Sequence, residues 1–306
     1  MKFIDFLVLL LLFALLLTGV YFLWLNLPTE SVEFEEYNVE ISKTLSIEST
    51  QFYTNMRYID EKISYSLADS CTEKKKKDFE AAIKLLEKET VLSFHQTLVE
   101  PEITITCSNI APEPAEADHF VAGEGGPSII INASQYSVIL SGKIALYRAE
   151  TCPTPQIATH ELLHALGFDH NSNSKSIMYP YTDCEQTLDQ HITNEINLLY
   201  EQASEADLII QTVVANKSGR YLNFKVSIAN YGLQDIETST FDLIIDDSVI
   251  RAFPIGNLEI GAKRTLEVTN LKIPKSTEEI TLLVKTFQPE MSKDNNKVTV
   301  KLVDNS

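Results

Sequence analysis

Residues 160–170 carry residue types at the spacing of a hydrolytic metal site: His-Glu-Leu-Leu-His-Ala-Leu-Gly-Phe-Asp-His. On a helix, residues four positions apart lie on the same face, so His160 and His164 can direct ring nitrogens at one cation. Gly167 lets the chain turn away from the helix, and His170 can return as a third ligand. Three nitrogen ligands leave the fourth tetrahedral position open, which is typical of a catalytic rather than a structural zinc.

Glu161 directly follows the first of these histidines and is the candidate general base. From this position a carboxylate can reach a water molecule beside the metal and accept its proton as the water attacks a peptide carbonyl. Histidines on amphipathic helices are often ordinary hydrogen-bonded or surface groups. The complete spacing of five fixed residues favours the zinc interpretation, with one catalytic zinc ion.

The segment resembles the zinc motif of the metzincin metallopeptidases, and within them the matrixins. The matching residues are His160, Glu161, His164, Gly167 and His170. The resemblance covers roughly residues 59–200 and implies an α+β zincin-like catalytic domain. It also implies that a substrate peptide binds along an exposed edge strand that precedes the zinc helix, in the region 118–140.

A second segment, Ser-Ile-Met-Tyr-Pro-Tyr at 176–181, follows the last histidine. The resemblance implies that Met178 forms a Met-turn, a methionine floor beneath the metal. The matrixin form Met-Tyr-Pro-x-Tyr is matched only as far as Pro180, and Tyr181 comes one position early. Tyr179 and Tyr181 are candidate oxyanion or substrate contacts.

Other family features are not matched. No cysteine precedes Cys71, so latency through a propeptide cysteine switch is not expected. The histidine set of a second, structural zinc is not visible, and His95, His119 and His191 are interpreted as ordinary surface or core residues. Calcium, common in matrixins, is possible, but no calcium site can be assigned.

The elements that must position these residues follow from hydrophobic periodicity. Alternation at 63–67 and 103–106, with helical spacing from Phe79 to Leu86 between them, predicts a strand, a helix and a strand. Gly123, Gly125, Gly126 and Pro127 predict a loop before a strand at 128–131. A cap at Thr154 with proline after it predicts the start of the zinc helix, and a further helix is expected from about 185 to 200.

After about residue 206 the pattern changes to period two, with about seven short strands in a hundred residues. This predicts an all-β sandwich of immunoglobulin-like type. Residues 206–208, 228–232 and 294–296 resemble CARDB domains of prokaryotic surface proteins, which implies an adhesion or spacer module.

The N-terminal segment from Phe6 to Leu25 is twenty residues without a charge, enough for a helix of roughly 30 Å that spans a bilayer. We expect a single uncleaved transmembrane helix, although a removed signal peptide is the alternative. The expected organisation is a membrane anchor at 1–27, a stalk at 28–55, a matrixin-like domain at 56–200 and a CARDB-like domain at 207–306.

All four cysteines follow the anchor, and an even count outside the cytoplasm suggests two disulfides. Three pairings are possible. We favour Cys71 with Cys107 and Cys152 with Cys184, because each pair brackets one local unit.

The acidic balance, Lys+Arg 25 against Asp+Glu 43, disfavours a nucleic-acid partner. The expected function is a membrane-anchored, extracytoplasmic zinc endopeptidase that acts on protein or peptide substrates. The alternative is a surface adhesion or binding protein with a catalytically inactive metzincin-like zinc domain. An intramembrane peptidase is disfavoured, because the zinc helix lies far from the apolar segment.

Overall fold

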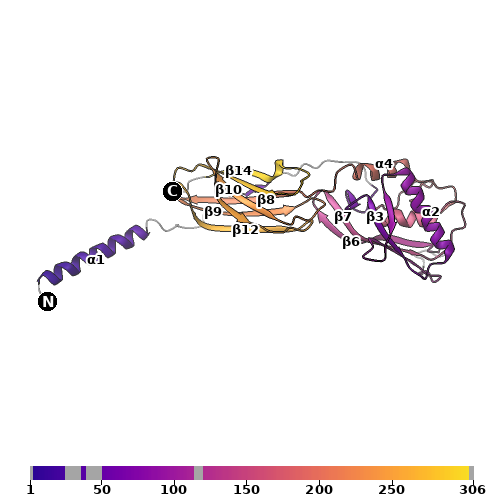
Figure 1. Cartoon of the computed structure of the whole chain (residues 1–306), viewed down its shortest axis with the longest axis horizontal. Coiled ribbons are helices and arrows are strands. Elements are labelled where there is room, and N and C mark those ends of the chain that lie inside the picture. Colours follow the sequence, from indigo (N-terminus) through magenta and orange to yellow (C-terminus); the bar gives the residue numbers. More distant parts are fainter. Residues whose placement is uncertain (1–2, 25–35, 39–49, 114–119, 303–306) are drawn as a thin grey trace.

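The computed structural model describes residues 3–24, 36–38, 50–113 and 120–302, and Figure 1 shows their arrangement. His119 lies outside the described residues, as does most of the segment expected to be a stalk. The described chain forms an α/β domain, from residue 50 to 204, and a β-sandwich, from residue 206 to 302.

The α/β domain contains one sheet in the order β2-β7-β5-β3-β4, with β6 paired to β7. The strands are β2 (Met56–Tyr58), β3 (Lys62–Leu67), β4 (Ser93–Gln96), β5 (Ile103–Cys107), β6 (Gly123–Ala133) and β7 (Tyr136–Leu146). All neighbouring pairs are parallel except β6 and β7, which form an antiparallel hairpin. The predicted strand, helix and strand are present as β3, α2 (Glu73–Glu89) and β5.

Helix α2 packs one face against the sheet because its apolar residues recur at helical spacing. Phe79, Ala82 and Leu86 are fully buried, whereas the lysine-rich face is largely solvated. The Thr72 hydroxyl accepts a hydrogen bond from the Lys75 backbone N–H and caps the first turn. The Cys71–Cys107 disulfide ties this helix start to the end of β5, as expected.

The glycine-rich segment was expected to be a loop, and this prediction is wrong. Residues 123–127 form the first half of β6 and pair with β7 from Leu146 to Gly142. Glycine is required because β6 passes directly over the zinc-motif helix. A Cβ atom at Gly125 would lie 2.2 Å from the Glu161 carbonyl oxygen, and one at Gly123 would lie 2.6 Å from the Glu161 Cγ.

Helix α3 (Gln156–Ala165) carries the zinc motif, and α4 (Gln190–Leu199) closes the core. Helix α4 starts five residues later than expected. The preceding residues are in extended pairing instead, because the Thr187 N–H donates to the Lys175 carbonyl and the Thr187 carbonyl accepts from the Ile177 N–H. The segment after α3 is thereby held by the segment before α4.

The β-sandwich was correctly predicted and consists of two four-stranded sheets, β1-β8-β9-β12 and β11-β10-β13-β14. Its strands are β8 (Leu208–Ser218), β9 (Tyr221–Asn230), β10 (Ser239–Ile245), β11 (Ser248–Pro254), β12 (Lys263–Lys272), β13 (Glu279–Thr286) and β14 (Lys297–Lys301), with a short 3₁₀ helix η1 (Asp294–Asn296). Phe224 and Phe241 are fully buried between the sheets and contact Phe253.

Two described parts of the expected stalk are paired with the folded domains. Strand β1 (Glu36–Asn38) adds to the edge of β8 in the sandwich. Two backbone hydrogen bonds join residues 50–52 to the α/β domain. The Phe52 N–H donates to the Gly167 carbonyl, and the Asp169 N–H donates to the Thr50 carbonyl.

The expected membrane-spanning segment lies in helix α1 (Phe3–Trp24), except Leu25, which is outside the described residues. Within the part of the chain that the structure describes, no helix is long and apolar enough to cross a membrane.

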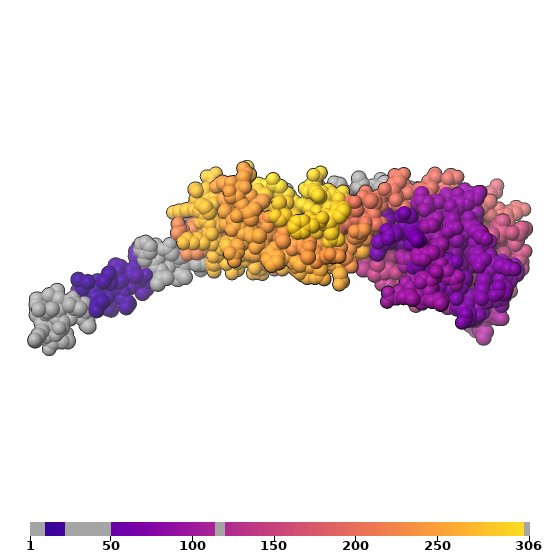
Figure 2. Space-filling model, in the orientation of Figure 1, coloured from indigo at the N-terminus to yellow at the C-terminus, as the bar shows by residue number. Residues whose placement is uncertain are grey.

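The two domains share an apolar contact, and the space-filling view shows them side by side (Figure 2). The buried residues of this junction are Ala133, Val138, Leu233 and Ile260, with Ile59, Ile131, Tyr136, Leu140 and Met291 packed around them. Beside it, the buried Arg57 guanidinium donates to the Leu199 and Gln202 carbonyls and to the Ser204 hydroxyl. The linker between the domains is therefore held by hydrogen bonds as well as by packing.

Candidate metal centre

The three motif histidines converge, as their spacing predicts. The Nε2 atoms of His160 and His164 are 3.0 Å apart, and each lies 3.2 Å from the Nε2 of His170. Nitrogens that bind one zinc at about 2.0–2.1 Å in a tetrahedral arrangement lie about 3.3 Å apart. The histidine set therefore has the dimensions of a zinc site.

Hydrogen bonds to backbone carbonyls fix which ring nitrogen of His160 and of His164 faces the centre. His160 Nδ1 lies 2.6 Å from the Ile177 carbonyl, and His164 Nδ1 lies 2.7 Å from the Phe168 carbonyl. A carbonyl only accepts, so both Nδ1 atoms carry the proton and both Nε2 atoms present lone pairs. Lone pairs this close repel one another unless a cation lies between them, so the three histidines can hold a metal ion.

The electrostatics of the rings also fit metal binding. Burial, followed by the neighbouring His164, lowers the pKa of His160 to about 4. Burial also lowers the pKa of His164 and His170. All three imidazoles are therefore neutral at pH 7, which is the form that binds a metal.

Glycine and methionine shape the turn that brings back the third histidine. Gly167 has φ +98°, a conformation that other residues rarely adopt, and a Cβ atom there would lie 2.5 Å from the Met56 side chain. His170 follows three residues later and is more exposed than the two helical histidines. Met178 is completely buried, directly after the residue whose carbonyl orients His160.

The polar residues that hold the segment around Met178 were missed from the sequence. The Ser176 hydroxyl donates to Asp189, accepts from the Asn171 amide and accepts from the Met178 N–H. The Asn171 N–H donates to the Met178 carbonyl. Isolated polar residues of this kind give no periodic signal, so only their spatial meeting reveals the network.

Glu161 is buried between α3 and β6, with 6% of its surface exposed. Burial, and then the negative charge of Glu124, raises the pKa of Glu161 to about 8. A bound cation next to it would lower this pKa, since opposite charge favours the carboxylate. Glu161 is thus placed where it can alternate between holding and releasing a proton near neutral pH.

The other candidate residues lie in chain segments next to the histidine motif. Tyr179 and Tyr181 follow Met178 and pack edge to face, with ring centroids 5.9 Å apart. Phe52 stacks on His164 at 5.7 Å, a contact that the sequence did not predict. The Cys152–Cys184 disulfide joins the segment before α3 to the segment after Met178.

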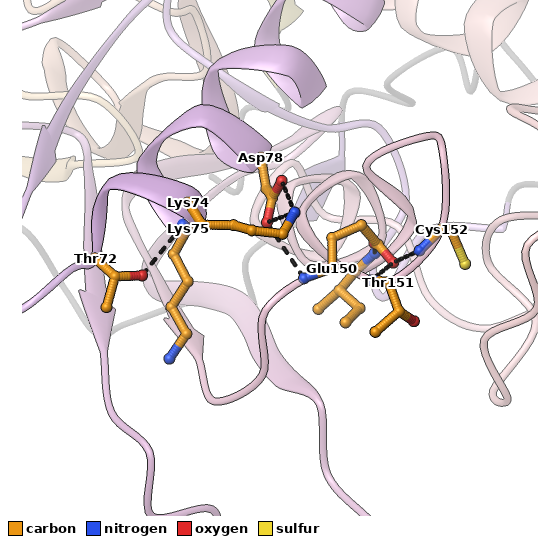
Figure 3. A network of polar contacts seen from close by, with 8 residues as sticks. Thr72, Lys74, Lys75, Asp78, Glu150, Thr151 and Cys152 are labelled. Atoms are coloured by element: carbon orange, nitrogen blue, oxygen red, sulfur yellow. Dashed lines mark hydrogen bonds and ion pairs between the residues drawn. The ribbon is translucent and has the colours of Figure 1, made fainter.

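The start of α3 is held by Glu150 rather than by the expected side chain of Thr154. Glu150 Oε1 accepts from the Thr151 and Cys152 N–H groups at 2.8 Å (Figure 3). Its Oε2 accepts from the Ile157 N–H at 3.0 Å. The Glu150 N–H in turn donates to Asp78 on α2. The carboxylate accepts from one N–H of the first turn of α3, that of Ile157, and complements the positive end of the helix.

Glu150 is 7% exposed and lies ten residues before the first histidine. Neither its type nor its spacing matches a capping motif, so the sequence held no signal for it. It holds the start of helix α3 from outside the candidate metal centre.

His95 and His191, the other described histidines, are separate from the centre. His95 lies on β4, and His191 lies at the start of α4 beside Glu195. Their interpretation as ordinary residues stays a prediction.

Comparison with known proteins agrees with both domains. Residues 56–201 match the matrixin family, and residues 205–300 match the CARDB family. None of the curated proteins compared matches the chain.

Solved structures with similarity to the chain include CARDB domains. One is the crystal structure of the CARDB domain of the PF1109 protein of Pyrococcus furiosus in complex with di-metal ions, with 14% identity, 32% of this chain and 90% of that chain covered, and a TM-score of 0.28. Another is a solution structure of the same domain, with 13% identity, 32% and 95% covered, and a TM-score of 0.27. By these family matches, the chain joins a matrixin-like domain at 56–201 to a CARDB-like domain at 205–300.

Proposed function

We propose that this chain is a zinc-dependent endopeptidase that is anchored to the cell membrane and acts outside the cytoplasm. The carrying observation is the convergence of three Nε2 atoms within 3.2 Å of one another, next to a buried glutamate that follows the first of these histidines. A zinc ion held by His160, His164 and His170 would supply Lewis-acid chemistry, acidifying a water molecule and polarising a peptide carbonyl.

The chain's own residues supply the proton transfers. Glu161 in its ionised form accepts a proton from the attacking water, and then delivers it to the amine nitrogen that leaves. The cover of β6 keeps bulk water away from Glu161, as the close approach of Gly123 and Gly125 indicates. Tyr179 and Tyr181 are candidates to donate to the oxyanion from the loop after Met178.

The substrate is proposed to bind as an extended strand along β6. In the described sheet β6 pairs with β7 on one side only, so its other edge offers backbone donors and acceptors to a peptide. A peptide paired there at Gly123 to Gly125 lies over the helix that carries Glu161. Backbone pairing favours extended polypeptides over compact domains as substrates.

The location is proposed from the chain's chemistry. Two disulfides, Cys71–Cys107 and Cys152–Cys184, favour an oxidising compartment. The uncharged segment from Phe6 to Leu25 is the proposed anchor, with the folded domains on the extracytoplasmic side. Extraction of the full chain from membranes at alkaline pH, compared with a chain lacking residues 1–27, tests the anchor. Release of both to the same extent would refute it.

The activity is tested with the full chain, because residues 36–38 and 50–52 pair with the folded domains. The parent, Glu161→Gln and His170→Ala are compared for cleavage of an unbiased peptide library and for bound zinc. We expect one zinc and cleavage for the parent, zinc without cleavage for Glu161→Gln, and loss of tight zinc for His170→Ala.

Zinc without cleavage in the parent would instead support the adhesion alternative, in which the metal domain is catalytically inactive. Cleavage by Glu161→Gln at the parent rate would refute the role of Glu161. A folded parent without zinc would refute the metal site itself.

A further inference from the structure

A short segment ahead of the matrixin-like domain contacts the candidate metal centre. We call residues 50–52 the strap, and they precede residue 56, where the match to the matrixin family begins. The strap runs antiparallel to the turn that follows helix α3, with Gln51 opposite Phe168 in an isolated β-bridge. It therefore lies beside the part of the chain that brings the third histidine back to the centre.

The strap and this turn are joined by backbone hydrogen bonds on either side of Phe168. The Phe52 N–H donates to the Gly167 carbonyl at 2.9 Å, and the Asp169 N–H donates to the Thr50 carbonyl at 2.7 Å. Both distances are those of ordinary amide hydrogen bonds. Because glycine is the most permissive residue, a turn that begins at Gly167 gains most from such an external restraint.

Two of the three histidines depend on this turn. Phe168 supplies the carbonyl that lies 2.7 Å from His164 Nδ1 and fixes which nitrogen of that ring faces the centre. Asp169 directly precedes His170, and its Oδ1 accepts from the His170 N–H at 2.7 Å. A shift of the turn would therefore displace the hydrogen-bond partner of His164 and the backbone of His170 together.

The side chain of Phe52 adds a direct contact with the centre. Its ring stacks on the His164 ring, with centroids 5.7 Å apart and an interplanar angle of 27°. Phe52 is 37% exposed, so its ring covers one face of the imidazole rather than filling the core. The Phe52 ring and the Phe168 carbonyl together hold the His164 ring with Nε2 towards the other two histidines.

Gln51 fixes the strap to the sheet. Its Nε2 donates to the Met56 carbonyl at 2.6 Å, and its Oε1 accepts from the Met56 N–H at 2.8 Å. Met56 in turn abuts the turn after α3, since a Cβ atom at Gly167 would lie 2.5 Å from the Met56 side chain. The strap, strand β2 and the turn are thus held to one another.

We propose that Gln51 and Phe52 are positioning residues of the metal centre, and that the strap holds the turn after α3 and the His164 ring in the geometry that binds zinc. The proposal rests on the zinc-binding part of the proposed function and not on peptide cleavage. Removal of a group that orients a metal ligand typically lowers metal affinity by about 10–100-fold. Loss of the strap contacts should therefore release the metal faster, although every ligand is still present.

The test is the rate of zinc release from the full chain into an excess of a chromogenic chelator. The variants are Phe52→Ala and Gln51→Ala, with Phe52→Tyr to restore a ring at the same place. The matched control is Tyr53→Ala, which removes a ring from the next residue, 60% exposed. Cobalt(II) in place of zinc reports the coordination geometry through its visible absorption. Urea unfolding of each variant verifies that it is folded under the conditions of the assay.

We expect zinc release to be about 10-fold faster or more in Phe52→Ala and Gln51→Ala, with a changed cobalt spectrum in both. Phe52→Tyr and Tyr53→Ala should match the parent. Release from Phe52→Ala at the rate of Tyr53→Ala would overturn the proposal. So would faster release with an unchanged cobalt spectrum, because Phe52 would then only shield the metal from the chelator.

The failure of this proposal can be told apart from the failure of the proposed function. A parent that holds zinc but cleaves no peptide would refute the peptidase, and the zinc release rates would still decide the role of the strap. A parent that cleaves peptides and releases zinc no more slowly than Phe52→Ala and Gln51→Ala would refute the strap alone. A folded parent that binds no zinc would overturn both.

Discussion

Removal of the Glu150 carboxylate should loosen helix α3, which carries the candidate metal ligands His160 and His164, without touching either histidine. Three backbone N–H groups donate to this side chain at 2.8 to 3.0 Å, and Glu150 is 7% exposed. A buried donor that loses its acceptor costs about 1–3 kcal/mol. Glu150→Ala should therefore lower the free energy of unfolding by about 3–6 kcal/mol, allowing for partial access of water.

Glu150→Gln gives a graded version of the same change. Its Oε1 can still accept from Thr151 and Cys152, but its amide nitrogen meets the Ile157 N–H, donor against donor. The expected loss is about 1–3 kcal/mol, from one unsatisfied N–H and one lost charge near a helix start. The charge-matched control is Glu80→Gln, at an exposed position of α2.

The assay is urea unfolding followed by circular dichroism, with zinc release recorded in parallel. The transition that releases zinc belongs to the matrixin domain, so a shift in it can be separated from unfolding of the sandwich. Zinc affinity should also fall in Glu150→Gln, because His160 lies in the first turns of the helix. The reasoning would be refuted if Glu150→Gln and Glu80→Gln agreed within about 0.5 kcal/mol.

Three further predictions concern the same domain. Gly125→Ala should lower the free energy of unfolding by about 1–3 kcal/mol and reduce turnover, because its Cβ would lie 2.2 Å from the Glu161 carbonyl oxygen. Gly126→Ala is the control, since a Cβ there meets open space. Equal effects of the two substitutions in urea unfolding would contradict this prediction. Replacing Cys152 and Cys184 together by serine should cost about 3–4 kcal/mol, the loop entropy for a sequence separation of 32, and an unchanged unfolding midpoint would argue against it. Because burial lowers the pKa of His160 to about 4, protons compete with zinc only at low pH. Zinc affinity, measured by chelator competition, should therefore fall between pH 7 and 5 by less than the roughly 25-fold per histidine that an ordinary pKa of about 6.5 would impose.

The sequence pattern was enough to predict a feature wherever all the residues that define it lie in one short segment. The histidine spacing at 160–170 depends only on helix periodicity and on one glycine turn, so the three converging histidines could be named in advance. The sandwich was likewise predictable from alternation, because a strand with one buried face repeats every two residues. Both cysteine pairs bracket short units, and the favoured pairing is the one in the structure.

Other features depend on which surfaces meet in the folded chain. Gly123 and Gly125 indicated a loop, but they form a strand because β6 crosses Glu161 with no room for a side chain. Glu150 caps α3 only because the chain folds back to the helix start, and Arg57 holds a linker more than 140 residues away in sequence.

The sequence by itself thus indicated the candidate metal ligands, the two domain types and the favoured cysteine pairing, all carried by local spacing. The tertiary structure decided what covers Glu161, what holds the helix and Met178, and how the sandwich is joined to the matrixin domain. These depend on long-range contacts between isolated residues, which have no periodicity to read.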